Sequence, residues 1–395
     1  MSAIAQTGVA GFLACFDALK DALPGCETVR EKAAESFRRL GLPGGTSARR
    51  AEAWKYTSLR PVAETGFMTP VASSFDVDLS ASSASLARFA ANPDFGPLPR
   101  PDRDPMVALN TMLAEDGAIL RVPARVDAGI VRIDSHGNGS HAFHPRHAIH
   151  LEAGATLIVL ETATGAGNYL HNAVTEITIG AGAHLTHIRL QDESPDAFHF
   201  ATIYVDVAEA GTYDGFSLVL GARIARTEIH AFLKGKNAVA HMNGAQLLTG
   251  NQHADFSSVV RHDAPSCTSR QTVKNVLAGR SRGVFQGRIE VARDAQKTDG
   301  YQMNQALLLS PDAEIDSKPE LEIFADDVKC SHGATVGELD AEQLFYLRSR
   351  GVPENEARAM LVRAFLTEAL DLVTNESIRT TLEKSVDAWW ERQAA

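Results

Sequence analysis

The pair Cys330-Ser-His332 has residue types that can bind a metal ion. In a β-strand, residues i and i+2 project from the same face, about 6.6 Å apart at a rise of ~3.3 Å per residue. A thiolate and an imidazole at that spacing can approach one metal ion, whose ligand bonds are ~2.0–2.3 Å long. They also suit iron and iron–sulfur chemistry. Two ligands leave a four-coordinate site incomplete, so a functional site needs ligands from elsewhere, most naturally a second chain. The alternative is a structural cysteine beside a polar histidine.

A second group of candidate ligands is His141, His144, His147 and His150, which recur every three residues. Imidazole binds zinc, copper, iron and nickel. A period of three matches neither a strand nor an α-helix, and Pro145 interrupts any regular element. Two interpretations therefore remain: a loop that gathers the four imidazoles on a metal, or ordinary surface and strand histidines.

Nucleotide-binding and acyl-transfer motifs do not explain this chain. Residues 137–142 fit a loose G-x-G-x-x-A pattern, but Pro145 and polar residues follow where the helix of a dinucleotide fold should begin. The sequence contains no G-x-x-x-x-G-K-[ST] and no G-x-S-x-G. We therefore expect no ATP binding through a P-loop and no serine-hydrolase chemistry.

The elements that must position these residues are short strands with alternating apolar side chains, as in residues 203–207 and 228–233. A recurring phrase separates them, and its central glycines are spaced by 28, 29 and 24 residues: Gly154, Gly182, Gly211 and Gly235. Such a period is typical of a solenoid, and glycine suits the tight corner of each turn. The pattern predicts a mainly β protein with a parallel β-helix core over residues 106–335.

Helical segments flank this core. Residues 1–60 form an N-terminal helical domain with one stripe at Phe12, Phe16, Leu19 and Leu23 and a second helix over 28–40. Residues 61–105, rich in Pro, Ser and Ala, are expected to be an extended linker. Residues 336–395 form a C-terminal domain of three short helices. The second has a predicted apolar stripe at Ala357, Met360, Leu361, Ala364, Phe365, Ala369, Leu372 and Val373. The third has Asn375 as its cap and a predicted buried face at Ile378, Leu382, Val386 and Trp389.

Composition excludes several classes of protein. A net charge of -11 over 395 residues argues against nucleic-acid binding. No apolar run is long enough to span a membrane, and the apolar stretch at residues 9–16 lacks the basic start of a signal peptide. The four cysteines have no paired spacing, which indicates free thiols in a reducing, cytoplasmic setting. Thirteen of the 14 histidines fall between residues 136 and 262. We attribute this cluster to polar strand faces and turns of the solenoid.

Five segments are similar to the SufD branch of the SufB/SufD scaffold family of the SUF iron–sulfur cluster assembly system. The C-terminal block, residues 297–351, is highly specific, whereas the middle of the chain resembles the family mainly in its pattern of short alternating strands. The matching segments are residues 297–310, 316–323, 325–340 and 343–351, together with the E-A-W-K-Y-T-S-L signature at 52–59.

The resemblance implies a right-handed parallel β-helix with helical domains at both ends. It implies a SufD-like, non-enzymatic scaffold that pairs with a SufB-like subunit and carries a SufC-like ATPase on its C-terminal helices. A transient iron–sulfur cluster would form at the interface between the two scaffold chains, with His332, beside Cys330, contributing to iron or to the nascent cluster. No cofactor is expected on the isolated chain, and ATP would enter only through the ATPase.

One departure separates this chain from the SufB branch, whose sulfur-accepting cysteine has no counterpart in residues 312–317. Met360, Leu361 and Phe365 are candidate ATPase contacts that could face inward or outward. A rod that pairs with a homologue could also form a homodimer. Two other functions stay open: a β-helix polysaccharide-processing enzyme using Asp312, Glu314 and Asp316, or a freestanding metal-binding protein using the 141–150 loop.

Overall fold

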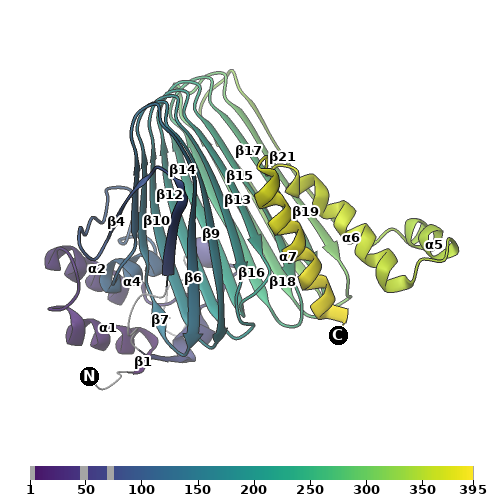
Figure 1. The fold of residues 1–395 in the computed structure, drawn as a ribbon, viewed down its shortest axis with the longest axis horizontal. Helices are drawn as coiled ribbons and strands as arrows, with labels where there is room; N and C mark the ends of the chain where they lie inside the picture. Colours follow the sequence, from purple (N-terminus) through teal and green to yellow (C-terminus); the bar gives the residue numbers. More distant parts are fainter. Residues whose placement is uncertain (1–4, 45–51, 69–74, 395) are drawn as a thin grey trace.

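The structure, a computed structural model, describes residues 5–44, 52–68 and 75–394. Two long sheets stand face to face and form the walls of a parallel β-solenoid, with helices at both ends of the chain (Figure 1). The predicted fold class is therefore confirmed. We call the two walls sheet I and sheet II.

Each sheet takes roughly every second strand of the chain. Sheet I contains β4 (Ser85–Arg88), β5 (Ala118–Val122), β7 (Ala142–Phe143), β8 (Arg146–Leu151), β10 (Leu170–Ile179), β12 (Phe198–Val207), β14 (Ile224–Leu233), β16 (His253–His262), β18 (Arg282–Val291) and β20 (Glu314–Ile323). Sheet II contains β3 (Phe75–Ser82), β6 (Asp127–Gly139), β9 (Thr156–Gly167), β11 (His184–Asp192), β13 (Thr212–Val219), β15 (Val239–Leu248), β17 (Thr268–Leu277), β19 (Asp299–Leu308) and β21 (Lys329–Gly337).

The two ends of the rod differ. At the first rung, β3 pairs antiparallel with β6 and β4 pairs antiparallel with β5, so both starting edges are covered. These strands belong to the segment 61–105, which we expected to be an extended linker. At the last rung, β20 pairs with β18 and β21 pairs with β19, and within the described chain neither has a neighbour on its other side. Unpaired edges of this kind are templates for another chain.

At the corners between strands, one residue of each turn adopts the left-handed backbone conformation, with positive φ. Positive φ occurs at Gly154 and Gly182, as the glycine phrase predicted. In the next two turns it occurs at Ala210 and Asn237 instead of Gly211 and Gly235. The position of the left-handed residue is therefore set by its place in the rung and not by the presence of glycine. The strain of a positive φ at a non-glycine residue is small enough for the packing of neighbouring rungs to offset it.

The interior of the rod has an apolar core lined from both walls. Alternate side chains point inward, and the core includes Ile149, Ile177, Ile203, Ile229, Leu157, Leu185, Tyr213 and Met242. Stacking in register places equivalent positions of successive rungs side by side, for example Ile177 beside Val205. Each rung therefore buries its apolar face against its two neighbours.

The outer face of sheet I is covered by the N-terminal elements. These are β1 (Ala5–Thr7), α1 (Gly8–Leu19), α2 (Glu27–Leu40), η1 (Glu52–Trp54), α3 (Arg60–Glu64), β2 (Gly66–Met68) and α4 (Pro105–Leu113). Phe12, Phe37 and Phe67 pack in one cluster with Leu170 and Phe198 of the sheet. This apolar cluster fixes the helices to the rod.

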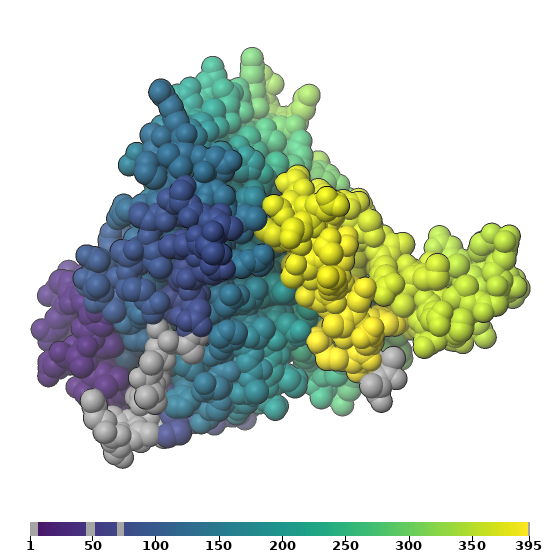
Figure 2. All heavy atoms as spheres, in the orientation of Figure 1, coloured from purple at the N-terminus to yellow at the C-terminus, as the bar shows by residue number. Residues whose placement is uncertain are grey.

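The outer face of sheet II is covered by α6 (Glu354–Leu370) and α7 (Glu376–Ala394), while α5 (Ala341–Ser349) projects away from the rod (Figures 1 and 2). The predicted buried face of α7 is confirmed, and Asn375 Oδ1 accepts a hydrogen bond from the backbone N–H of Ile378. The predicted stripe of α6 is partly wrong. Its buried residues are Ala357, Ala359, Val362, Leu366, Ala369 and Leu370. None of the helices in the described parts of the chain is long and apolar enough to span a membrane.

Candidate functional site

Cys330 and His332 lie on β21, the last strand of sheet II. Cys330 pairs in register with Gly300, and His332 pairs with Gln302 of β19. Their spacing of two residues places both on the same face of the strand. Cys330 packs against the apolar core, so this face is the interior side of the rod.

The two side chains differ in exposure because the rod ends at this rung. Cys330 is half-buried, and a Cβ on Gly300 would approach its sulfur to 3.4 Å. Burial raises the pKa of the Cys330 thiol, and the nearby Asp299 acts in the same direction. The thiol is therefore protonated and weakly nucleophilic in the isolated chain. His332 is exposed, because no further rung of the described chain covers it.

Beneath His332 the interior is polar. Gln271 pairs with Gln302, which pairs with His332, so the three side chains form one column along the rod. Gln302 is fully buried, and neither its amide oxygen nor its amide nitrogen has a hydrogen-bonding partner among the described residues. A buried amide without partners is rare and costs stability.

A second polar column reaches the same end of the rod through direct hydrogen bonds. The amide of Gln246 donates to Asn275 at 2.8 Å, and that of Asn275 donates to Asn304 at 2.7 Å. Asn304 in turn donates to the hydroxyl of Ser317 on β20 at 3.1 Å. Ser317 lies in residues 312–317, a segment that contains no cysteine. Polar groups therefore line the last rungs on both walls.

Large apolar side chains border the open rung. Ile323 is the last residue of β20, Phe324 begins the final corner, and Val336 lies near the end of β21. Phe324 is 68% exposed and Val336 is 55% exposed. Exposed apolar side chains next to unpaired strand edges are typical of an interaction surface.

The three candidate ATPase contacts on α6 do not share one environment. Met360 is exposed, whereas Leu361 is half-buried beside α5. Phe365 packs against the rod, with its ring 4.5 Å from the ammonium of Lys274, which also pairs with Glu368 at 2.5 Å. Phe365 therefore faces inward and anchors the helix, while Met360 faces outward.

Sequence reasoning missed the most exposed aromatic residues of this domain. Phe345 is 74% exposed and Tyr346 is 55% exposed, both on α5. With Leu361 they border an open groove of about 880 Å³. The sequence did contain an indication of these exposed aromatic residues. Four consecutive apolar residues, Leu-Phe-Tyr-Leu at 344–347, point in all directions around a short helix, which cannot bury all of them.

The W-K-Y signature has a structural role in this chain. Trp54 stacks on the guanidinium of Arg226 at 4.2 Å, and its indole N–H donates to Asp104 at 3.2 Å. The hydroxyl of Thr57 donates to Asp255 at 2.5 Å. These contacts fix the N-terminal segment to the outer face of sheet I.

The histidines of residues 141–150 do not form a metal-binding loop. They occupy β7, β8 and the residues beside them, and no three of them bring ligand atoms together in the described parts of the chain. His144 packs beside the ring of Phe12, while His147 accepts a hydrogen bond from the N–H of Ala118 at 3.0 Å. Of the two interpretations, strand histidines fit the structure better than a metal-binding loop, because parallel pairing draws this segment into the first rungs.

The acidic residues considered for an enzyme do not form a group of unpaired carboxylates. Asp316 lies on the outer face of β20 and pairs with Arg282 at 2.5 Å. Glu314 lies 3.9 Å from the same guanidinium, and Asp312 is exposed in the turn before the strand. Ion pairing on an outer face gives these side chains a structural role.

Comparison with known proteins identifies the family. The family described as "SUF system FeS cluster assembly, SufBD core domain" matches residues 131–365, which include most of the rod, the Cys330–His332 pair and much of α6. The chain belongs to this SufBD family. The resemblance inferred from the sequence is therefore confirmed.

Individual relatives support the SufD branch. The chain is 39% identical over 245 residues to the iron–sulfur cluster assembly protein SufD of Escherichia coli. It is 37% identical over 218 residues to a SufBD family protein of Synechocystis, and 33% identical over 240 residues to the chloroplastic protein ABCI7 of Arabidopsis thaliana. These alignments cover 62%, 55% and 60% of the chain, but only 58%, 48% and 50% of the respective relatives.

Proposed function

We propose that this chain is a SufD-like, non-catalytic scaffold that assembles iron–sulfur clusters together with a SufB-like subunit. The observation that carries the proposal is the position of His332. It is an exposed imidazole on the interior side of the last rung, two residues from Cys330, at the end of the rod whose strand edges lack neighbours in the described chain. A partner that pairs with this edge covers His332 and adds its own ligands.

Chemistry at this interface requires a second chain. Cys330 and His332 offer one thiol and one imidazole, which leave a tetrahedral iron or cluster site incomplete. On the facing wall, β20 carries Ser317 and no cysteine, so this chain offers no sulfur-accepting thiol there. In the proposed complex the SufB-like subunit supplies sulfur, and His332 supplies a nitrogen ligand to iron or to the nascent cluster.

A SufC-like ATPase would bind to the surface formed by Phe345, Tyr346 and Met360, which we call the α5 surface. Phe345 and Tyr346 are exposed on α5, which projects from the rod, and Met360 is exposed on α6 (Figure 2). Large exposed aromatic side chains next to a groove are suited to insertion into a partner. ATP hydrolysis in the partner would then shift the two scaffold chains at the last rung through α6 and its anchors on β17.

The test of the proposal is co-expression of the chain with SufB-like and SufC-like partners. We expect His332→Ala to leave the complex intact on size-exclusion chromatography and to remove most of its iron and acid-labile sulfide. Ser331→Ala is the matched control, since Ser331 is an exposed neighbour on the opposite face of β21. Normal cluster content in the His332→Ala complex would overturn the role of this residue.

The ATPase surface is tested by the same co-purification. Phe345→Ser with Tyr346→Ser is expected to reduce recovery of the ATPase while leaving the SufB-like subunit bound. Leu372→Ser is the control, because Leu372 is also exposed but lies beyond the end of α6. Equal recovery of the ATPase with both variants would exclude the α5 surface.

A further inference from the structure

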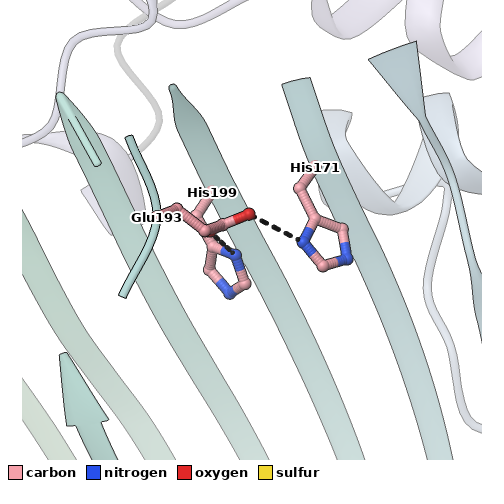
Figure 3. Close-up of side chains that lie close together, drawn as sticks. All are labelled: His171, Glu193 and His199. Carbon is pink, nitrogen blue, oxygen red and sulfur yellow. Dashed lines mark hydrogen bonds and ion pairs between the residues drawn. The ribbon is translucent and has the colours of Figure 1, made fainter. Parts of the chain in front are cut away.

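A group of potential metal ligands lies inside the rod, far along the chain from His332. His171 on β10 and His199 on β12 are paired in register on neighbouring rungs. Glu193 follows the end of β11 and lies between the two imidazoles (Figure 3). All three are buried, and their ligand atoms lie within 4.8 Å of one another. They form the one group of three or more such residues found in the described parts of the chain.

The carboxylate of Glu193 bridges the two rings. One of its oxygens lies 3.2 Å from Nδ1 of His171, and the other lies 2.7 Å from Nδ1 of His199. The ring centroids are 4.9 Å apart, with the planes nearly perpendicular. The nitrogens therefore point toward a common carboxylate from two rungs, an arrangement in which one ion can be shared by all three side chains.

Hydrogen bonding inside the protein leaves part of this group unsatisfied. Nδ1 of His199 is close to Glu193 but is not aligned for a hydrogen bond. The hydroxyl of Tyr169, also fully buried, has no aligned partner among the described residues. Two buried polar atoms without aligned hydrogen bonds, close to one carboxylate, leave room for an additional partner.

We propose that His171, Glu193 and His199 bind one first-row divalent transition metal ion of the zinc and iron(II) class. Two imidazoles and one carboxylate are a ligand set used for both metals. Thiolate-preferring ions are excluded, because the ligand set contains no sulfur. The proposal goes beyond the scaffold function, since none of its ligands lies in the last rung.

The contact between Arg189 and His199 sets the tautomer that His199 must change when a metal ion binds. In the metal-free chain an Arg189 N–H donates to Nε2 of His199 at 3.1 Å, which leaves the ring proton on Nδ1. A metal at Nδ1 needs the other tautomer, in which the proton has moved to Nε2. Arg189 would then give up this contact and keep its bonds to Glu161 at 3.1 Å and Thr227 at 3.4 Å.

The surroundings provide space for a further ligand and a path for the ion. A cavity of about 20 Å³ beside His171 and His199 can hold one water molecule. A surface groove of about 690 Å³ lies over Glu193, between the following turn and the end of α7. Asp192 and Asp196 line this groove, and Asp192 pairs with Arg392 of α7 at 2.9 Å. The groove is lined by three carboxylates and by two guanidinium groups, Arg223 and Arg392, and it brings solvent close to Glu193.

The test uses the full-length chain, which is first stripped of metal with a chelator and then incubated with Zn²⁺ or Co²⁺. We expect one Zn²⁺ per chain to remain bound after desalting, and the Zn²⁺-loaded chain to melt at a higher temperature than the metal-free chain. We expect Co²⁺ bound at the same site to give visible absorption. Glu193→Gln and His199→Asn should abolish all three effects. His184→Asn is the matched control, because His184 and His241 flank Asp214 on the outside of the rod at 2.7 Å and 2.5 Å.

Three outcomes would overturn the proposal. They are substoichiometric Zn²⁺ in the wild-type chain, unchanged binding in Glu193→Gln, or loss of binding in His184→Asn alone. X-ray absorption of the Zn²⁺-loaded wild-type chain keeps the test decisive if a buried variant fails to fold. Two imidazoles and oxygen ligands are expected, and sulfur scattering would place the metal on a cysteine instead. His332→Ala should retain the metal, which separates this result from the cluster-assembly function.

Discussion

His332 and Gln302 stand side by side in one column of the rod, yet the first is exposed and the second is fully buried with its amide unpartnered. The difference comes from position alone, because β21 is the last strand of its sheet in the described chain. Gln302 therefore carries a cost in the isolated chain at the place where the proposed partner binds. A variant that lacks the Gln302 amide measures how much this group destabilises the isolated chain, independently of any role in the complex.

We predict that Gln302→Met stabilises the isolated chain by about 1 kcal/mol, since it removes two buried polar atoms without partners and keeps the side-chain volume. Urea denaturation measures this change in the free energy of unfolding. Asn304→Met is the contrasting variant, because Asn304 is bonded to Asn275 and Ser317 and should lose stability. Destabilisation by Gln302→Met equal to that of Asn304→Met would contradict this account.

The attachment of the C-terminal helices gives a second prediction. Phe365→Ala should reduce stability by about 1–2 kcal/mol, a discounted value for a half-buried aromatic side chain, because it uncovers the rod and removes the ring over Lys274. Met360→Ala should change stability by less than about 0.5 kcal/mol, since Met360 is exposed. Thermal unfolding of both variants checks that Phe365 faces the rod and Met360 faces solvent. A larger loss of stability in Met360→Ala than in Phe365→Ala would show that this orientation of α6 is wrong.

Most of the fold followed from the sequence because a solenoid repeats its signals. Alternating apolar residues predicted strands, and a period near 28 residues predicted rungs. The corner glycines were predicted only in part, because Ala210 and Asn237 take the left-handed position in their turns. A single sequence does not show which residue of a corner phrase adopts that conformation when the neighbouring rungs can impose it.

The candidate site was predictable to a different degree. Cys330 and His332 followed from their residue types and from the family resemblance, but their place at an uncovered end required the strand pairing. The histidines between residues 136 and 262 were attributed to polar faces and turns, whereas His171, His187, His199 and His262 are buried inside the rod. Alternation alone did not reveal this, because sheet I has apolar or covered side chains on both faces and its inward side is set by long-range packing.

The buried histidines make stability depend on pH. His262 is fully buried, and burial lowers its pKa to about 4. Its ordinary pKa is about 6.5, so between these values the unfolded chain binds the proton and the folded chain does not. Full stability is present above about pH 6.5. It falls with decreasing pH by up to about 1.4 kcal/mol per unit until the folded pKa is reached.

His262→Gln should therefore flatten the loss of stability between pH 6.5 and about 4 relative to the wild-type chain. His184 provides a contrast of opposite sign, because its hydrogen bond to Asp214 raises its pKa. Its contribution is present below the ordinary pKa and is lost as pH rises through the raised one. Melting temperatures between about pH 4 and 6.5 measure the effect of His262, and those above pH 6.5 measure the effect of His184. Identical pH profiles for wild type and His262→Gln would refute the assignment.

The uncovered last rung predicts that the chain forms a homodimer when no SufB-like subunit is present. Strand edges flanked by Phe324 and Val336 favour pairing with a second copy, since pairing satisfies backbone groups and buries both side chains. Light scattering should find a dimer for the wild-type chain and a monomer for Phe324→Asp with Val336→Lys. Leu372→Asp, which places a charge on an exposed residue of the C-terminal domain, should leave the dimer intact. A monomeric wild-type chain, or a dimer that survives both edge substitutions, would show that the open rung does not drive self-association.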